Sequence, residues 1–175
     1  MAGLFDTLGE RLSQGNIGFL LIGGRALQAY GIVRQTLDVD WLATDGDIGK
    51  IGEIMRGEGY RVVSETASFL RFRHKATGVI DVDVLLVDAA TFGAIDKEAR
   101  ATGDRSRLWR VPCPAHLVAL KLHAIKNDAS RESRDAADII ELIRVTGGQV
   151  SDETLRGLCE RYGPDEIYER IQARL

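Results

Sequence analysis

The most informative segment of the chain is residues 37–42, with the sequence LDVDWL. Apolar residues alternate with Asp38 and Asp40, which is the period-two pattern of a strand whose two faces differ. Both carboxylates therefore leave the same face, where two like charges are unfavourable unless solvent or a cation relieves them. An edge strand with a solvated face is the alternative, but Trp41 favours a more interior strand. The segment predicts a metal-binding strand, because hard oxygen ligands on a rigid element suit Mg²⁺.

Upstream of this strand, residues 17–22 have the composition of a buried strand and run into Gly23 and Gly24. A short helix is expected over residues 25–30. Glycine lets the backbone approach a ligand closely, and a helix N-terminus favours phosphate through its free N–H groups and its dipole. By itself a glycine pair between two elements indicates only a turn.

Downstream, residues 79–87 (VIDVDVLLV) repeat the pattern with Asp81 and Asp83. The strand is otherwise strongly apolar and is expected to be central. A buried carboxylate requires a charge or hydrogen-bond donors to offset its desolvation, and a metal shared with Asp38 and Asp40 would supply that charge. Either Asp81 or Asp83 fits as the third carboxylate, with a slight preference for Asp83.

The remaining pattern predicts helices near the start of the chain, at residues 48–55 and at residues 91–101, and strands at 60–63, 69–73 and 108–111. After Pro114 the periodicity is helical to the end. At 175 residues and 45% hydrophobic content, the chain can bury one good core. We therefore expect a single domain over residues 1–175, with an α/β catalytic core at 1–112 and a helical part at 113–175.

Charge and composition exclude several classes of protein. A net charge of −3 argues against a protein that mainly coats nucleic acid. Basic clusters at residues 71–75 and 100–110 favour solvated faces when each is taken alone. Cys113 and Cys159 lack partners at metal-ligand spacing, so neither zinc nor a disulfide framework is indicated. No membrane span or secretory signal is recognised, and a cytoplasmic location is expected.

Taken together, the glycine pair, residues 38–40 and the later strand aspartate resemble the core signature of the nucleotidyltransferase superfamily, which has the polymerase-beta-like fold. The stretch from residue 22 to residue 40 is similar to bacterial branches with toxin-type (AbiEii-like) and small antibiotic-modifying members. Residues 117–124 (LVALKLHA) and 134–138 (RDAAD) also look like those branches. The resemblance touches residues 17–143 in order; it is specific for the superfamily and poor for the substrate.

The resemblance implies an α+β fold with a mixed β-sheet, flanking helices and a helical C-terminal part. It implies transfer of a nucleoside monophosphate from an NTP, with Mg²⁺ or Mn²⁺ as cofactor. Asp38 and Asp40 would bind two metals, and Asp81 or Asp83 would assist the catalytic metal and the attacking hydroxyl. Gly23 and Gly24 would hold the triphosphate.

Four further residues are candidate nucleotide contacts. Lys121 interrupts an apolar helical face between Leu117 and Ile125, where a triphosphate would explain a cation; a lysine whose stem covers the core is the alternative. Arg34 and Thr36 precede the metal strand, and Arg25 follows the glycine pair; turn or solvated roles are equally consistent with the sequence.

The acceptor is left open by the sequence. An RNA 3′ end or a protein side chain is favoured faintly by the arginine clusters, and the toxin-like resemblance suggests an antitoxin partner. A small molecule such as an aminoglycoside or lincosamide is the alternative acceptor. A non-catalytic nucleotide-binding or partner-binding module with the same fold is the rival from another class.

Overall fold

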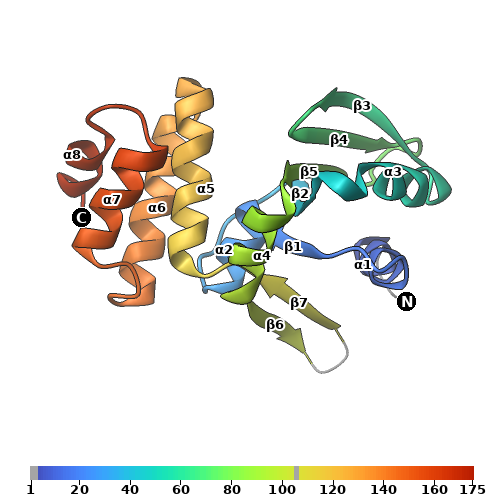
Figure 1. The fold of residues 1–175 in the computed structure, drawn as a ribbon, viewed down its shortest axis with the longest axis horizontal. Helices are drawn as coiled ribbons and strands as arrows, with labels where there is room; N and C mark the ends of the chain where they lie inside the picture. Colours follow the sequence, from blue (N-terminus) through green and yellow to red (C-terminus); the bar gives the residue numbers. More distant parts are fainter. Residues whose placement is uncertain (1–3, 105–106) are drawn as a thin grey trace. The chain divides into compact units, whose positions relative to one another are not determined.

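The computed structural model describes residues 4–104 and 107–175. The chain forms two compact units, shown in Figure 1. Unit 1 comprises residues 1–26 and 35–111, and unit 2 comprises residues 27–34 and 112–175. The chain thus enters unit 2 briefly, through residues 27–34, before it returns to form the strand that carries Asp38 and Asp40.

Unit 1 is built on a five-stranded mixed sheet with the order β1-β2-β5-β4-β3. The central pair, β2 and β5, is parallel, and the other neighbours are antiparallel. The strands are β1 (Phe19–Ile22), β2 (Asp38–Thr44), β3 (Tyr60–Thr66), β4 (Phe69–His74) and β5 (Asp81–Val87). The interior position expected for the strand that contains Trp41 is confirmed, because β2 has a hydrogen-bonded neighbour on each side.

Alternation along these strands separates an apolar face from a polar one. Val39, Trp41, Val82 and Val84 are all at most 1% exposed and share one face of β2 and β5. Burying a valine or leucine side chain contributes about 1.5–3 kcal/mol, so this face fixes the register of the central pair. The aspartates lie on the opposite face, at the start of both strands.

Helices and a hairpin complete unit 1. Its helices are α1 (Leu4–Gln14), α3 (Ile48–Gly57) and α4 (Ala89–Lys97); α2 (Gly23–Ala29) follows β1 directly and ends in unit 2. The helix expected at residues 91–101 is wrong at its C-terminal end. Residues from Arg100 onward form β6 (Arg100–Asp104), which pairs with β7 (Arg107–Val111). Arg105, from the second basic cluster, lies outside the described residues.

Unit 2 is helical after Pro112. Its helices are α5 (Pro114–Asn127), α6 (Glu132–Thr146), α7 (Asp152–Tyr162) and α8 (Ile167–Gln172). Pro114 opens α5, where its missing N–H costs nothing. The Ser151 side chain caps α7 by accepting a hydrogen bond from the Thr154 N–H, and Gly147 ends α6 in the left-handed conformation.

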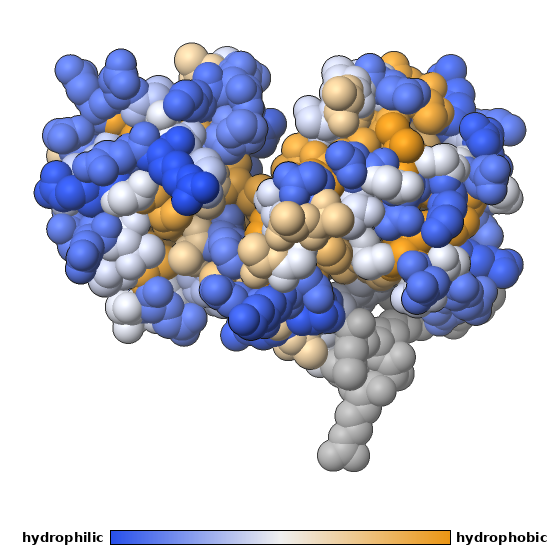
Figure 2. Space-filling view, viewed as in Figure 1, coloured by the Kyte–Doolittle hydropathy of each residue, from blue (hydrophilic) through white to orange (hydrophobic). Residues whose placement is uncertain are grey.

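The fold predicted from the sequence, a mixed sheet with flanking helices and a helical C-terminal part, is confirmed. Among the described residues, no helix is both long and apolar enough to span a membrane. Hydrophilic residues dominate the face shown in Figure 2, with hydrophobic residues reaching the surface over β3 and β4. This agrees with the exposure of Val62 and Val63 on β3.

Candidate metal centre

The four strand aspartates are brought together by the parallel pairing of β2 and β5. Asp38 pairs with Asp81 and Asp40 pairs with Asp83 in the register of these strands. Because residues two apart on a strand point the same way, all four side chains leave the same face of the sheet. Neighbouring strands lie about 4.8 Å apart, which places carboxylates from different strands within reach of one ion.

Three of these carboxylates form a close cluster. Asp38, Asp40 and Asp83 each offer an oxygen atom, and these atoms all lie within 4.8 Å of one another. Asp83 is only 6% exposed, whereas Asp38 and Asp40 are half-buried. Negative charges this close require positive charge nearby. A hard divalent cation such as Mg²⁺ or Mn²⁺ fits this all-oxygen donor set and would leave coordination positions for water and phosphate.

Arg71 supplies part of that positive charge. On β4, which neighbours β5, it pairs in register with Asp83 and donates from Nε to Oδ1 at 2.8 Å and from Nη2 to Oδ2 at 2.6 Å. Hydrogen bonding to Asp83, together with the negative charges of Asp83, Asp38 and Asp81, raises the pKa of Arg71 above its ordinary value despite partial burial. The guanidinium therefore stays charged and holds Asp83 in one orientation.

Asp81 has a different partner. Arg73 donates from Nε to Asp81 Oδ2 at 3.2 Å, and both side chains are more exposed than those of the Arg71–Asp83 pair. Burial, followed by the negative charge of Asp81, raises the pKa of Tyr60 to about 12. The described carboxylate cluster includes Asp83 and not Asp81, so the geometry favours Asp83 as the third ligand.

Gly23 is required by the position of Asp40. It has a φ of +61°, and a Cβ atom added there would lie 2.0 Å from Asp40 Oδ2 and 2.6 Å from Asp40 Cγ. Ile22 pairs with Asp40 across β1 and β2, so the chain leaves β1 directly beside this carboxylate. Only glycine permits both the left-handed backbone and the close approach.

Three other predicted nucleotide contacts lie in the segment of the chain between β1 and β2. Gly24 and Arg25 are in the first turn of α2 and are half-buried. Thr36 lies, also half-buried, in the loop two residues before β2. Their roles stay predictions.

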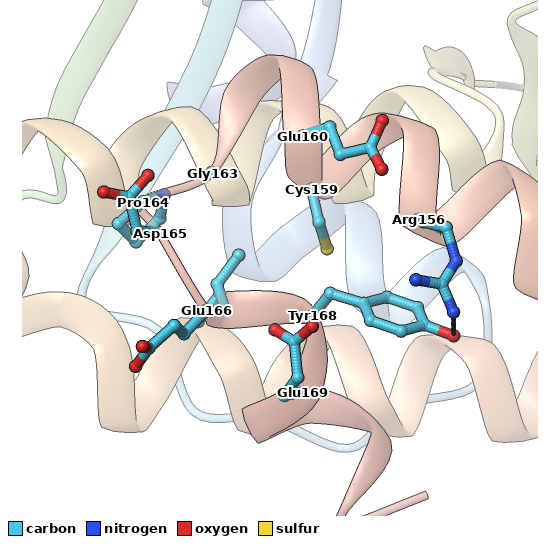
Figure 3. Close-up of a pocket in the computed structure, with 10 residues that line it drawn as sticks. Arg156, Cys159, Glu160, Gly163, Pro164, Asp165, Glu166, Tyr168 and Glu169 are labelled. Atoms are coloured by element: carbon cyan, nitrogen blue, oxygen red, sulfur yellow. Dashed lines mark hydrogen bonds between the residues drawn. The ribbon is translucent and has the colours of Figure 1, made fainter.

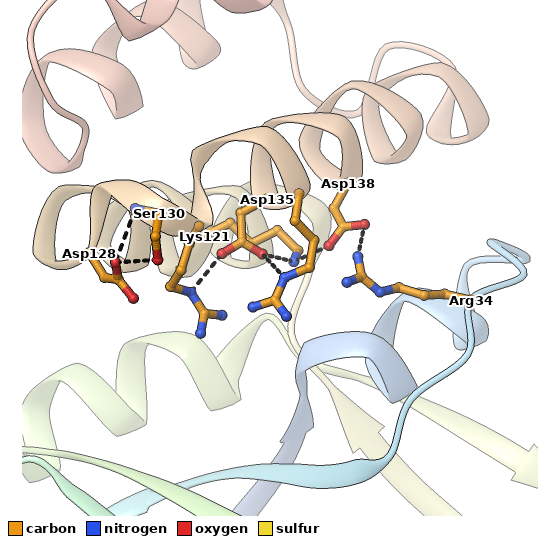
Figure 4. Close-up of polar contacts among 8 residues, drawn as sticks. Arg34, Lys121, Asp128, Ser130, Asp135 and Asp138 are labelled. Atoms are coloured by element: carbon orange, nitrogen blue, oxygen red, sulfur yellow. Dashed lines mark hydrogen bonds and ion pairs between the residues drawn. The ribbon is translucent and has the colours of Figure 1, made fainter.

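The remaining predicted contacts, Arg34 and Lys121, belong to unit 2 and share a carboxylate. Lys121 Nζ donates to Asp138 Oδ2 at 2.6 Å and to Asp135 Oδ1 at 3.0 Å, and Arg34 Nη1 donates to Asp138 (Figure 4). Arg131 also donates to Asp135, at 2.9 Å. Burial alone would raise the pKa of Asp135, but the charges and hydrogen bonds of Lys121 and Arg131 lower it below its ordinary value.

Two arginines of the sheet contact the predicted aspartates, which the sequence did not indicate. Arg71 and Arg73 were interpreted as part of a solvated cluster, yet they pair with the two aspartates of β5. Their spacing carried a usable signal, because two cations at positions i and i+2 of one strand match two carboxylates at i and i+2 of another. The match became recognisable only once the structure showed that β4 pairs with β5.

Unit 2 also contains a pocket of about 330 Å³ along α7 and α8, shown in Figure 3. Cys159 and the carboxylates of Glu160, Asp165, Glu166 and Glu169 are among its lining residues. Burial, with the charges of Glu169 and Glu160, raises the pKa of the Cys159 thiol to about 11. The thiol is therefore protonated near neutral pH and is a poor nucleophile.

No protein-family model and no curated protein matches the chain. Solved structures do match it. The antibiotic-resistance factor ANT(2'')-Ia has a TM-score of 0.70 at 15% identity, over 98% of this chain and 94% of that chain. A complex of ANT(2'')-Ia with adenylyl-2"-tobramycin gives 0.71 at 13% identity, over 91% and 97%. Lincomycin-bound LnuA, a lincosamide antibiotic adenylyltransferase, gives 0.60 at 13% identity, over 81% and 96%. The chain therefore has the fold of nucleotidyltransferases.

Proposed function

We propose that this protein is a metal-dependent nucleotidyltransferase that transfers a nucleoside monophosphate from an NTP to a hydroxyl acceptor. The observation that carries the proposal is the cluster of Asp38, Asp40 and Asp83, with oxygen atoms within 4.8 Å of one another on two parallel strands. The fold shared with nucleotidyltransferases supports it independently.

Two divalent ions, held by these carboxylates, would lower the pKa of the acceptor hydroxyl and stabilise the pyrophosphate leaving group. The acceptor oxygen forms a bond to the α-phosphorus, the bond from that phosphorus to the bridging oxygen breaks, and the hydroxyl proton passes to solvent. Asp38 and Asp40 would bind and place the ions. Arg71 engages both oxygens of Asp83 and would hold this carboxylate in one orientation as the third ligand.

The donor nucleotide is assigned to the β1 side of the cluster. Gly23 leaves the backbone open beside Asp40, which suits the close approach of a triphosphate. Gly24, Arg25, Arg34, Thr36 and Lys121 are proposed as further nucleotide contacts, on the resemblance described above. We also propose that residues 1–175 form a single domain, with a catalytic core at 1–112 and a helical part at 113–175. A cytoplasmic location is part of the same proposal.

An RNA 3′ end or a protein side chain is the proposed acceptor class. A small-molecule acceptor is the second candidate, because ANT(2'')-Ia and LnuA, whose chains are covered almost completely, are an antibiotic-resistance factor and an antibiotic adenylyltransferase. An antitoxin partner is supported by the sequence resemblance alone.

The test is release of pyrophosphate from each NTP in the presence of Mg²⁺ and a panel containing RNA, protein and aminoglycoside or lincosamide acceptors. We expect turnover with one acceptor class, lost in Asp38→Asn and retained in Asp81→Asn, which changes a carboxylate on the same face outside the cluster. NTP binding without turnover under every condition would favour the non-catalytic module instead.

A further inference from the structure

A strip of arginines continues the polar face of the sheet beyond the carboxylates. Arg71 pairs in register with Asp83, and Arg73 is two positions further along β4, so both point to the face that carries the cluster. On β3, Arg61 pairs with Arg73 and extends the same face to the edge of the sheet. From β5 to β3 is two strand spacings, or about 10 Å.

This strip is open to solvent. The side chains of Arg71 and Arg73 are 45% and 55% exposed. Arg61 is also exposed and forms no ion pair with any described residue. Residues Ser64 and Thr66, which share this face of β3 through their pairing with β4, are exposed as well.

An aromatic ring accompanies the arginines. Phe69 pairs with Leu85 of β5, which places it on the same face as Arg71. The Arg71 guanidinium carbon lies 5.5 Å from the centre of the Phe69 ring, which is half-exposed. Partly exposed aromatic rings and exposed guanidinium groups on an open sheet provide stacking surfaces for unpaired bases.

The charge balance of this face distinguishes between acceptor classes. Four carboxylates, from Asp38, Asp40, Asp81 and Asp83, lie on the same face as three guanidinium groups. Arg71 and Arg73 pair with Asp83 and Asp81, and Arg61 forms no ion pair with a described residue, so the arginines present positive charge beside the carboxylate cluster to an anionic acceptor. The same guanidinium groups disfavour a polycationic acceptor such as an aminoglycoside on this part of the face.

We propose that the acceptor is the 3′ end of a single-stranded nucleic acid, whose backbone crosses the strip formed by Arg61, Arg71 and Arg73 and whose base stacks on Phe69. This inference rests on the proposed function, because it assigns the acceptor of the same site. The 3′ hydroxyl lies at the carboxylate cluster, on the side of β5 that faces away from Gly23. The donor and acceptor therefore approach from opposite sides of Asp83.

The test is fluorescence anisotropy of a labelled 12-nucleotide single-stranded RNA in Mg²⁺ without NTP. In the variant Arg61→Gln/Arg73→Gln we expect at least tenfold weaker binding, and a slope of log K against log salt that is shallower by about 1.4, at about 0.7 per lost phosphate contact. Phe69→Leu should weaken binding about tenfold with an unchanged salt slope.

The matched control is Arg11→Gln/Arg56→Gln on α1 and α3. It removes the same charge, and Arg11, like Arg73, is 55% exposed and paired with one carboxylate. The control should bind RNA within twofold of the wild type. Equal losses in both double variants would show that only net charge matters and would overturn the proposal.

Calorimetry with Mg²⁺ and NTP separates this inference from the proposed function. Arg61→Gln/Arg73→Gln should bind the nucleotide as the wild type does. If it loses nucleotide binding and keeps RNA binding, the strip serves the donor and the inference is wrong. If wild type binds Mg²⁺ and NTP but no RNA, the acceptor belongs to another class and the inference also fails. Absence of nucleotide binding in the wild type would instead overturn the proposed function.

Discussion

Gly23 lies directly against the carboxylate of Asp40: a Cβ atom at this glycine would be 2.0 Å from Asp40 Oδ2. The glycine that follows β1 and the aspartate on β2 therefore lie in direct contact, although 17 positions separate them in the sequence. A side chain at residue 23 must displace the carboxylate or the backbone, and either change disturbs the cluster.

Gly23→Ala should therefore abolish Mg²⁺-dependent NTP binding while the protein remains folded. The backbone cost of alanine in the left-handed region is about 1–2 kcal/mol, which a folded domain tolerates. Gly31→Ala is the matched control, because Gly31 has a φ of +85° but nothing within 4 Å of an added Cβ. Calorimetric titration should show Mg²⁺-dependent NTP binding to Gly31→Ala and none to Gly23→Ala. Equal binding by both variants would contradict the role assigned to Gly23.

Arg71→Gln should destabilise the metal-free protein by about 1–2 kcal/mol, because it leaves the buried Asp83 beside two other carboxylates. Saturating Mg²⁺ should stabilise this variant more than the wild type, since the ion takes over the charge compensation. Urea denaturation in EDTA and in Mg²⁺ measures both effects. Arg73→Gln should lower the free energy of unfolding by less than about 1 kcal/mol, because its partner Asp81 is more exposed. The same Mg²⁺ effect on wild type and Arg71→Gln would count against a metal at Asp83.

Asp135→Asn should lower the free energy of unfolding by about 3–5 kcal/mol at neutral pH. It leaves Lys121, 12% exposed, with only Asp138, which Arg34 shares. The lowered pKa of Asp135 means that its stabilising effect is present above the ordinary carboxyl pKa and is lost as the pH falls through the lowered value. Chemical denaturation at several pH values measures this; the exposed Glu141→Gln on the same helix should change stability by less than about 0.5 kcal/mol. If Asp135→Asn lowered the free energy of unfolding by the same amount in strong acid, the stabilising role of the ionised Asp135 would be refuted.

Cys159 should resist alkylation at pH 8, because its thiol pKa is raised to about 11 by burial and by Glu169 and Glu160. The corresponding stability contribution is present below the ordinary thiol pKa and is lost as the pH rises through 11. Mass spectrometry after iodoacetamide treatment, in native buffer and in urea, reads the reactivity of this cysteine directly. Native labelling as fast as in urea would contradict the burial of the thiol.

Much of the fold follows from periodicity within single segments. The alternation around Asp38 and Asp81 indicated strands, and β2 and β5 lie there. The hairpin of β6 and β7 was only half predicted, because residues 100–104 lack an apolar alternation and are held as a strand by pairing with β7. Propensity in one segment cannot reveal a partner elsewhere in the chain.

The candidate carboxylates could be named from the sequence, but their geometry could not. Asp38 and Asp40 share a face by spacing alone, whereas the choice between Asp81 and Asp83 depends on the register of β2 with β5 and on Arg71. Lys121 was singled out because it interrupts an apolar helical face, but its ion pairs with Asp135 and Asp138 depend on how α5 packs against α6. Ion pairs between residues this far apart in the sequence depend on the tertiary structure, so the sequence alone does not predict them.

The most direct test of the metal centre is calorimetric titration of each NTP with Mg²⁺ into wild type, Asp38→Asn/Asp40→Asn and Asp81→Asn. We predict metal-dependent binding of at least one NTP to wild type and to Asp81→Asn, and none to the double variant. No binding of any NTP to well-folded wild-type protein, or unchanged binding by the double variant, would contradict the assignment of the Asp38, Asp40 and Asp83 cluster as a nucleotide-bearing metal centre.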